Sequence, residues 1–178
     1  MREGGKILSA ILKELMAMVK PGLTTRDFNV RARELMREYA VQPSFLGYNN
    51  FPAVLCTSVN EQAVHAIPSD YILQDGDLLK LDIGVFYKGL HTDMAETVII
   101  GGRKFFNKVY SKKQKLVSAT REALEAGIGV ARARNTIGDI GEAIHAVIDE
   151  YGLTVIRELG GHGIGSRLHE DPFIPNYR

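Results

Sequence analysis

The chain has 178 residues, of which 45% are hydrophobic and 24% charged, enough apolar material for one domain with its own core. Its formal net charge of +1 argues against a dedicated nucleic-acid binder, and its composition argues against disorder. The single cysteine, Cys56, excludes an intramolecular disulfide and fits the reducing cytoplasm. Because of this near-neutral charge we expect no specific nucleic-acid partner. No run is long and apolar enough to cross a bilayer, so we expect no membrane partner.

The N-terminal segment predicts an amphipathic helix rather than a signal sequence. Apolar residues recur at helical spacing from Ile7 to Val19, while charged residues interrupt the apolar run and no cleavage site follows. After a Pro-Gly break, a second helix is predicted from an N-cap at Thr24 or Thr25 through Tyr39.

Two strand-like segments, LLKLDIGVF and HTDMAETVII, flank a short turn and carry one aspartate each, Asp82 and Asp93. A two-residue turn at Tyr87-Lys88 would place the aspartates directly opposite each other, and one at Lys88-Gly89 would place them on a diagonal. Either turn puts both carboxylates on one face of the sheet, whereas an odd-length loop or a bulge would separate them. Two carboxylates that close repel each other unless a cation lies between them, and a pair of divalent metals suits that geometry.

The alternative is that one or both aspartates face solvent beside the polar turn. Because both strands are mostly apolar, a carboxylate within each is costly to bury without a partner, which favours the metal site.

The second half of the chain repeats the order of the first. A helix from about Lys108 to Ala126 precedes a break, an N-cap at Asn135 or Thr136, a helix through Tyr151 and a predicted strand, LTVIREL. Two segments share the same order of an N-cap residue, an Asp, an apolar stripe and a Glu-Tyr pair at the end of the helix: TTRDFNVRARELMREYAVQP and NTIGDIGEAIHAVIDEYGLTV. This order suggests an internal duplication.

The duplication predicts one α+β domain over residues 1–178, with a first half-repeat of about 1–102 and an incomplete second half-repeat of about 103–178. A full second copy would end in its own hairpin, so the last strands of the sheet are expected to be missing. The alternative is that the likeness is coincidental and that the domain is whole as written.

Three of the histidines are candidates for chemistry. His162 lies in GGHGIG, where the glycines allow a ligand or another backbone to approach closely, although a tight turn is the commoner reason for such a pattern. Joined to two carboxylates, it would make a site for a divalent transition metal. His65 and His169 lie in loops, where an imidazole can hydrogen-bond a substrate and exchange a proton, or can be an ordinary polar residue. His91 lies two residues before Asp93, so it is expected on the same face of the strand, where it could be a supporting partner of that carboxylate. His145 is expected to pack within a helix.

Taken in order, TSVNEQAVHAIP, LDIGVFYKGLHTD, GGHGIG and LHEDP resemble the type I methionine aminopeptidases over essentially the whole chain. The resemblance implies a pita-bread fold with an internal pseudo-twofold repeat and two divalent metal ions (Co, Mn, Fe or Zn). It implies that Asp82, Asp93 and His162 are metal ligands and that His65 and His169 are catalytic residues that contact the substrate. The residues implied for the methionine pocket are Phe45, Tyr48, Phe51, Cys56 and Leu168.

The chain departs from the family pattern in places. Phe45 and Leu168 stand where bacterial members commonly carry Cys and Phe, and Ala66 replaces a Gly, so the shape of the pocket and its strict methionine selectivity are open. Family members continue into strands that supply two glutamate ligands, and this chain ends before either. We therefore expect the chain alone to be a poor or inactive peptidase.

The implied function is metal-dependent removal of the N-terminal methionine from nascent polypeptides, with the ribosome as a further candidate partner. Two alternatives stay open at this stage. One is a related proline-directed peptidase, against which the SVNE and HAIP segments argue. The other is a non-catalytic pita-bread module that acts in binding.

Overall fold

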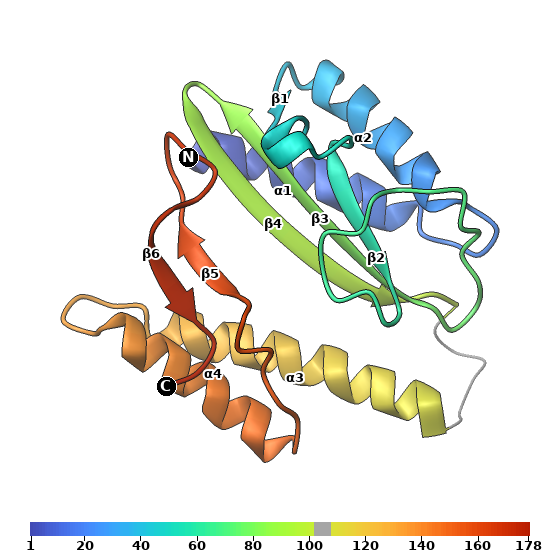
Figure 1. The fold of residues 1–178 in the computed structure, drawn as a ribbon. Coiled ribbons are helices and arrows are strands. Elements are labelled where there is room, and N and C mark those ends of the chain that lie inside the picture. Colours follow the sequence, from blue (N-terminus) through green and yellow to red (C-terminus); the bar gives the residue numbers. More distant parts are fainter. Residues whose placement is uncertain (102–107) are drawn as a thin grey trace. The chain divides into compact units, whose positions relative to one another are not determined.

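The computed structural model describes residues 1–101 and 108–178, which belong to two compact units (Figure 1). The first unit comprises Met1–Phe106 with Gly165–Leu168, and the second comprises Asn107–Ile164 with His169–Arg178. The expected boundary between two half-repeats, at about residue 102, lies outside the described residues. Across the part of the chain that is described, no helix combines the length and hydropathy needed to cross a membrane.

A four-stranded antiparallel sheet is the frame of the first unit (Figure 1). Its central strand is β3 (Leu78–Tyr87), which pairs along its whole length with β4 (Leu90–Ile99). On its other edge β3 pairs with β1 (Gln42–Pro43) near one end and with β2 (Leu55–Val59) near the other. A short 3-10 helix, η1 (Tyr48–Asn50), lies between β1 and β2 in the chain. The predicted strand hairpin is therefore confirmed.

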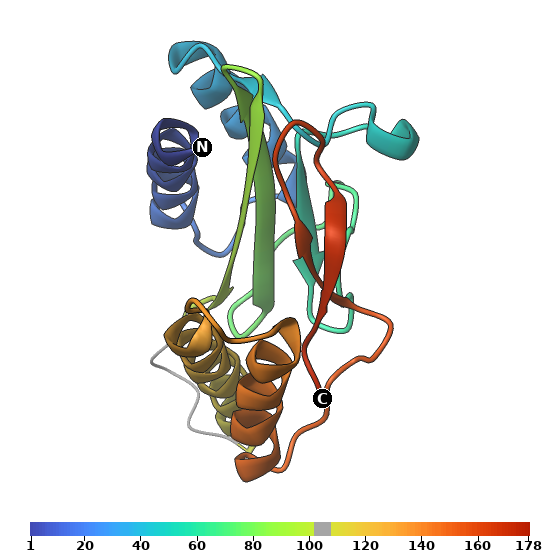
Figure 2. The ribbon, with the colours of Figure 1, turned by 90° about the vertical axis from the view of Figure 1, so that its left-hand side faces the viewer.

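Two helices, α1 (Arg2–Ala17) and α2 (Thr25–Glu38), cover one face of this sheet, as Figure 2 shows. Their apolar stripes meet the odd-numbered residues of β3 in one buried cluster, because side chains alternate between the faces of a strand. The cluster includes Leu8, Ile11, Leu15, Phe28, Leu35, Leu79, Leu81, Ile83 and Val85. Even-numbered residues of β3 therefore point to the face opposite the helices.

The second unit contains two packed helices and a small hairpin. The helices are α3 (Lys108–Val130) and α4 (Ile137–Glu150), which bury Ala119, Ala123 and Ile148 between them. The hairpin joins β5 (Gly160–Gly163) to β6 (Glu170–Pro175), and β6 packs on α4.

Helices α2 and α4 begin with the same local structure. Thr24 and Thr136 are the N-caps, and each shares a capping box with an aspartate three residues later, Asp27 and Asp139. Both helices have 14 residues and a tyrosine at the C-cap. This likeness is consistent with an internal duplication, which stays a prediction.

The predicted strand LTVIREL is wrong. Residues 153–159 form no strand, and Leu153 and Val155 pack against the helix pair of the second unit. A short apolar segment can cover a helix surface as well as pair in a sheet, and here Leu153 and Val155 are partly buried against the helices. The strand begins at Gly160, so His162 lies within a strand rather than after one.

The central position of β3 gives a stability prediction. Leu81 is fully buried, so Leu81→Ala should lower the free energy of unfolding by about 2–5 kcal/mol. Leu46→Ala makes the same chemical change at a side chain that is 43% exposed, and it should cost less than about 1 kcal/mol. Urea unfolding of the two variants measures both values, and equal losses would contradict the assigned face of β3.

Candidate metal and substrate site

The hairpin turn decides where the two aspartates lie. The turn is Lys88-Gly89, and both residues have positive φ (49° and 82°), as a type I′ two-residue hairpin turn requires. In this register Asp82 pairs with Ala95 and Asp93 pairs with Gly84. The two aspartates are diagonal neighbours on the face away from α1 and α2, which is the second of the two arrangements expected from the sequence.

The two carboxylates interact strongly. Asp82 is half-buried, and burial, the charge of Asp93 and a hydrogen bond to Asp93 together raise the pKa of Asp82 to about 7. Asp93 is exposed. Without a cation the pair therefore holds a proton up to near-neutral pH. A divalent cation can replace that proton, so this part of the site fits a metal ion.

Cys56 lies beside this pair, because it is the cross-strand partner of Asp82. Its side chain is buried, and burial followed by the charges of Asp82 and Asp93 raises the pKa of the thiol to about 12. The thiol is therefore neutral at physiological pH. It acts as an apolar wall beside the carboxylates rather than as a thiolate ligand or nucleophile.

The second unit holds His162 and His169, whose ring centroids are 4.2 Å apart. His162 Nδ1 lies 2.8 Å from the Gly163 carbonyl oxygen, and a carbonyl can only accept, so Nδ1 is the protonated nitrogen. In this neutral tautomer the lone pair of the ring lies on Nε2, the atom through which such a histidine binds a metal ion. A Cβ at Gly163 would collide with the backbone of Asp171, so this glycine allows the strands to approach closely.

The remaining predicted residues lie in or beside the sheet of the first unit. Phe45 is buried, and a Cβ added at Gly84, the partner of Asp93, would be 2.9 Å from its ring. Phe45 therefore lies next to the carboxylate pair. Leu168 is also buried, Tyr48 is 41% exposed in η1, and Phe51 is half-buried just after it. His65 is exposed in the connection that follows β2.

Within the described residues, no three His, Cys, Asp or Glu side chains gather closely enough to hold a metal ion. Asp82 and Asp93 are therefore a two-ligand arrangement within the first unit. The role of His162 as a third ligand stays a prediction from the sequence.

Sequence reasoning missed the hydrogen bonds of His91. Its backbone N–H donates to the Gly165 carbonyl at 2.8 Å, and its Nδ1 lies 2.9 Å from the Ser44 hydroxyl oxygen. These bonds join β4 to the residues just before Phe45 and to the segment that carries Leu168. Parity marked His91 as a supporting residue, but no sequence signal pointed to Ser44 as its partner.

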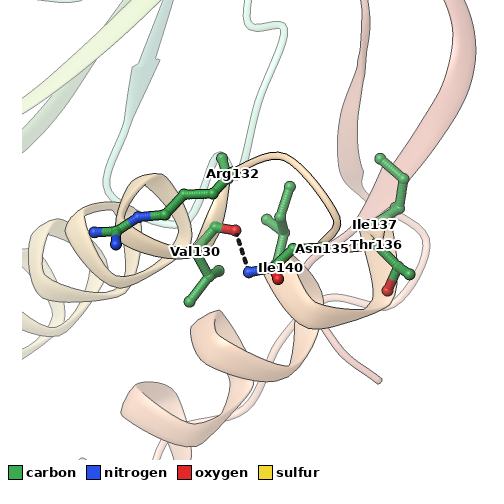
Figure 3. A pocket seen from close by; sticks show the side chains of 7 residues that line it. Val130, Arg132, Asn135, Thr136, Ile137 and Ile140 are labelled. Carbon is green, nitrogen blue, oxygen red and sulfur yellow. Dashed lines mark hydrogen bonds between the residues drawn. The ribbon is translucent and has the colours of Figure 1, made fainter.

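A hollow of about 420 Å³ lies in the second unit, at the connection between α3 and α4 (Figure 3). Val130, Ile137 and Ile140 give it apolar walls, and Asn135 Nδ2 donates to the Val130 carbonyl at its edge. None of the predicted site residues lines this hollow.

Comparisons with known proteins agree with the resemblance of the motifs. Residues 1–178 match the metallopeptidase family M24. A methionine aminopeptidase of Clostridium acetobutylicum is 38% identical over 178 residues, which are 99% of this chain and 69% of that protein. The crystal structure of a methionine aminopeptidase from Thermotoga maritima matches with a TM-score of 0.93 and 35% identity, covering 99% of this chain and 69% of that one.

A prolidase from Pyrococcus furiosus matches with a TM-score of 0.82 and 21% identity, covering 98% of this chain and 49% of that one, and this likeness shows the fold alone. The predicted fold class is confirmed: the chain has the α+β pita-bread fold of these proteins.

The raised pKa of Asp82 predicts how stability varies with pH in metal-free protein. The folded state binds a proton on Asp82 up to about pH 7, whereas an unfolded aspartate releases it near pH 3.8. Stability should therefore fall as pH rises from 4 to 7, by at most about 4 kcal/mol from this group.

Asp82→Asn should remove this fall in stability between pH 4 and 7, so the variant should be more stable than wild type at pH 7.5. Asp70→Asn, at an exposed aspartate paired with Arg26, should keep the wild-type slope. Urea unfolding with a chelator at several pH values measures the slopes, and equal slopes for Asp82→Asn and wild type would contradict the interaction of the pair.

Proposed function

Because the chain belongs to the metallopeptidase family M24, we propose that it removes the N-terminal methionine from polypeptides with the help of divalent metal ions. The similar proteins named methionine aminopeptidase support this substrate, at 38% identity over nearly the whole chain. The observation that carries the proposal is the Asp82–Asp93 pair, which is costly without a cation and becomes favourable with one.

The proposed metal ligands are Asp82, Asp93 and His162. Carboxylate oxygens and a neutral imidazole suit Co, Mn, Fe or Zn, so the ligand types leave the identity of the metal open. Bound ions would act as Lewis acids on the scissile carbonyl and would neutralise the paired carboxylates.

His65 and His169 are the proposed substrate-contacting histidines. In this scheme His169 hydrogen-bonds the carbonyl oxygen of the bond to be cleaved, and His65 hydrogen-bonds the peptide nitrogen. His169 is exposed and lies at 4.2 Å, between ring centroids, from the proposed ligand His162. This short separation would place a carbonyl oxygen near both the metal and a hydrogen-bond donor.

The methionine pocket is proposed to be lined by aromatic and apolar side chains from several segments: Phe45, Tyr48, Phe51, Cys56 and Leu168. The neutral Cys56 thiol suits the thioether side chain of methionine, because a thiolate would be poorly solvated there. Selectivity by shape is modest, since one methylene is worth about 1–3 kcal/mol. A small second residue in the substrate is expected to be preferred.

The substrates proposed are nascent polypeptides in the cytoplasm, with the ribosome as a candidate partner. The single, buried Cys56 is compatible with a reducing compartment. A proline-directed peptidase is less well supported than a methionine aminopeptidase, because the prolidase shares the fold at only 21% identity.

Peptide hydrolysis tests this proposal. The protein, expressed from its complete reading frame, is assayed on Met-Ala-Ser with Co²⁺, Mn²⁺, Fe²⁺ or Zn²⁺ after removal of bound metal. Asp93→Asn should lower kcat/KM by at least about 100-fold and weaken metal binding in calorimetry, because it removes one charged ligand of the pair.

Asp70→Asn, at an exposed aspartate outside the site, should have wild-type activity. Peptides that begin with Lys or Pro should be cleaved far more slowly than Met-Ala-Ser. Comparable cleavage of all three peptides, or full activity of Asp93→Asn, would contradict the proposed function.

A further inference from the structure

The residue before Ala66 has an unfavourable backbone conformation. His65 has a φ of 59°, in the left-handed region that residues with a Cβ seldom adopt. Its side chain is exposed, so burial does not select this conformation. Strained residues persist only where their surroundings hold them, and they gather at functional sites.

Two residues of strand β2 hold the His65 backbone in this conformation through hydrogen bonds to Ala66. The Ala66 N–H donates to the Ser58 hydroxyl oxygen at 3.2 Å, and the Ala66 carbonyl accepts from the Thr57 N–H at 3.0 Å. Ser58 is only 2% exposed. The Ala66 N–H belongs to the peptide group that joins His65 to Ala66, so fixing its direction fixes the ψ angle of His65. The serine hydroxyl therefore acts directly on the strained residue.

The other end of the same loop is also tied to the sheet. Asn60 has a φ of 51°; its Nδ2 donates to Asp77 at 2.8 Å, and its Oδ1 accepts from the Leu78 N–H at 3.0 Å. Lys80 Nζ donates to the Asn60 carbonyl at 3.0 Å. Residues 60–66 are thus held at both ends by β2 and β3 (Figure 1). This gives the loop a fixed starting point as well as a fixed end.

The hydrogen bond from the Ala66 N–H to the Ser58 hydroxyl, which we call the clamp, lies on the face of the sheet that carries the carboxylates. Ser58 is the cross-strand partner of Lys80, and Cys56 is the partner of Asp82, one pleat further along the same two strands. Side chains two residues apart share a face, so Ser58 and Asp82 lie on the same side of the sheet. The clamp thereby sets the place of His65 relative to Asp82 within the first unit.

We propose that Ser58 is a positioning residue, which holds the His65 backbone in its left-handed conformation so that the imidazole meets the substrate. This inference rests on the proposed function, in which His65 contacts the peptide nitrogen. Ser58 itself touches neither the substrate nor the metal. Without its hydroxyl, Ala66 loses one of two hydrogen bonds and His65 relaxes toward commoner backbone conformations.

The expected result for Ser58→Ala is a fall in kcat of about tenfold with Met-Ala-Ser, because His65 is in place for a smaller fraction of the time. KM should change less than about twofold and metal affinity should be unchanged, since the carboxylate pair keeps its own register. Ser69→Ala is the matched control. It removes a serine hydroxyl that accepts from the Tyr71 N–H in the same connection between β2 and β3, and kcat should stay at the wild-type value.

A double-mutant cycle separates positioning from general loosening of the fold. Ser58→Ala is made in the wild type and in His65→Ala, and kcat is measured for all four proteins. The proposal expects the tenfold loss in the wild type and less than about a twofold loss in the His65→Ala background. Equal losses in both backgrounds, or no loss in the wild type, would overturn it.

Hydrogen exchange provides a readout that does not depend on activity. The Ala66 amide should exchange about tenfold faster in Ser58→Ala than in wild type, while amides in the core of β3 keep their protection. Unchanged exchange at Ala66 would overturn the clamp. If Met-Ala-Ser is not cleaved by the wild type, the proposed function fails, and the exchange data still decide whether Ser58 holds the loop.

Discussion

The repulsion between Asp82 and Asp93 is the constraint on which the site depends. Neither carboxylate can move away from the other, because odd-numbered β3 residues such as Ile83 are fixed in the core under α1 and α2. The Lys88-Gly89 turn fixes the partner strand, and a shift of one residue would turn either aspartate to the wrong face. The fold thus keeps two carboxyl groups close together, at a cost in stability once both are ionised, and this arrangement is typical of a cation site.

Around this pair, supporting hydrogen bonds come from residues that have no chemistry of their own. Ser58 holds the loop of His65, and the bonds of His91 join β4 to the segments that carry Phe45 and Leu168. The Gly163 carbonyl sets the tautomer of His162 in the second unit. In each case a hydrogen bond to the backbone or to a hydroxyl fixes a side chain or the backbone segment that carries one, which is what preorganisation of a site requires.

Sequence reasoning found the features that depend on local periodicity. Strand alternation predicted that Asp82 and Asp93 share a face, because any two-residue turn preserves parity, but only the structure distinguished Lys88-Gly89 from Tyr87-Lys88. The segment after Tyr151 was predicted as a strand, but Leu153 and Val155 pack against helices, and the elements that an apolar segment packs against are decided by tertiary structure. Ser44 and Ser58 could not be found from the sequence, since a serine acquires its partner only when distant segments fold together.

The titration of Asp82, followed by carboxyl-carbon NMR with and without Zn²⁺, tests the central claim most directly. In metal-free protein the pKa of Asp82 should be about 7, well above its ordinary value of 3.8. With Zn²⁺ bound, the same carboxyl should stay ionised to far lower pH, because the cation replaces the shared proton. A pKa near 4 without metal, or a raised pKa that Zn²⁺ leaves unchanged, would contradict the account of the carboxylate pair as a metal site.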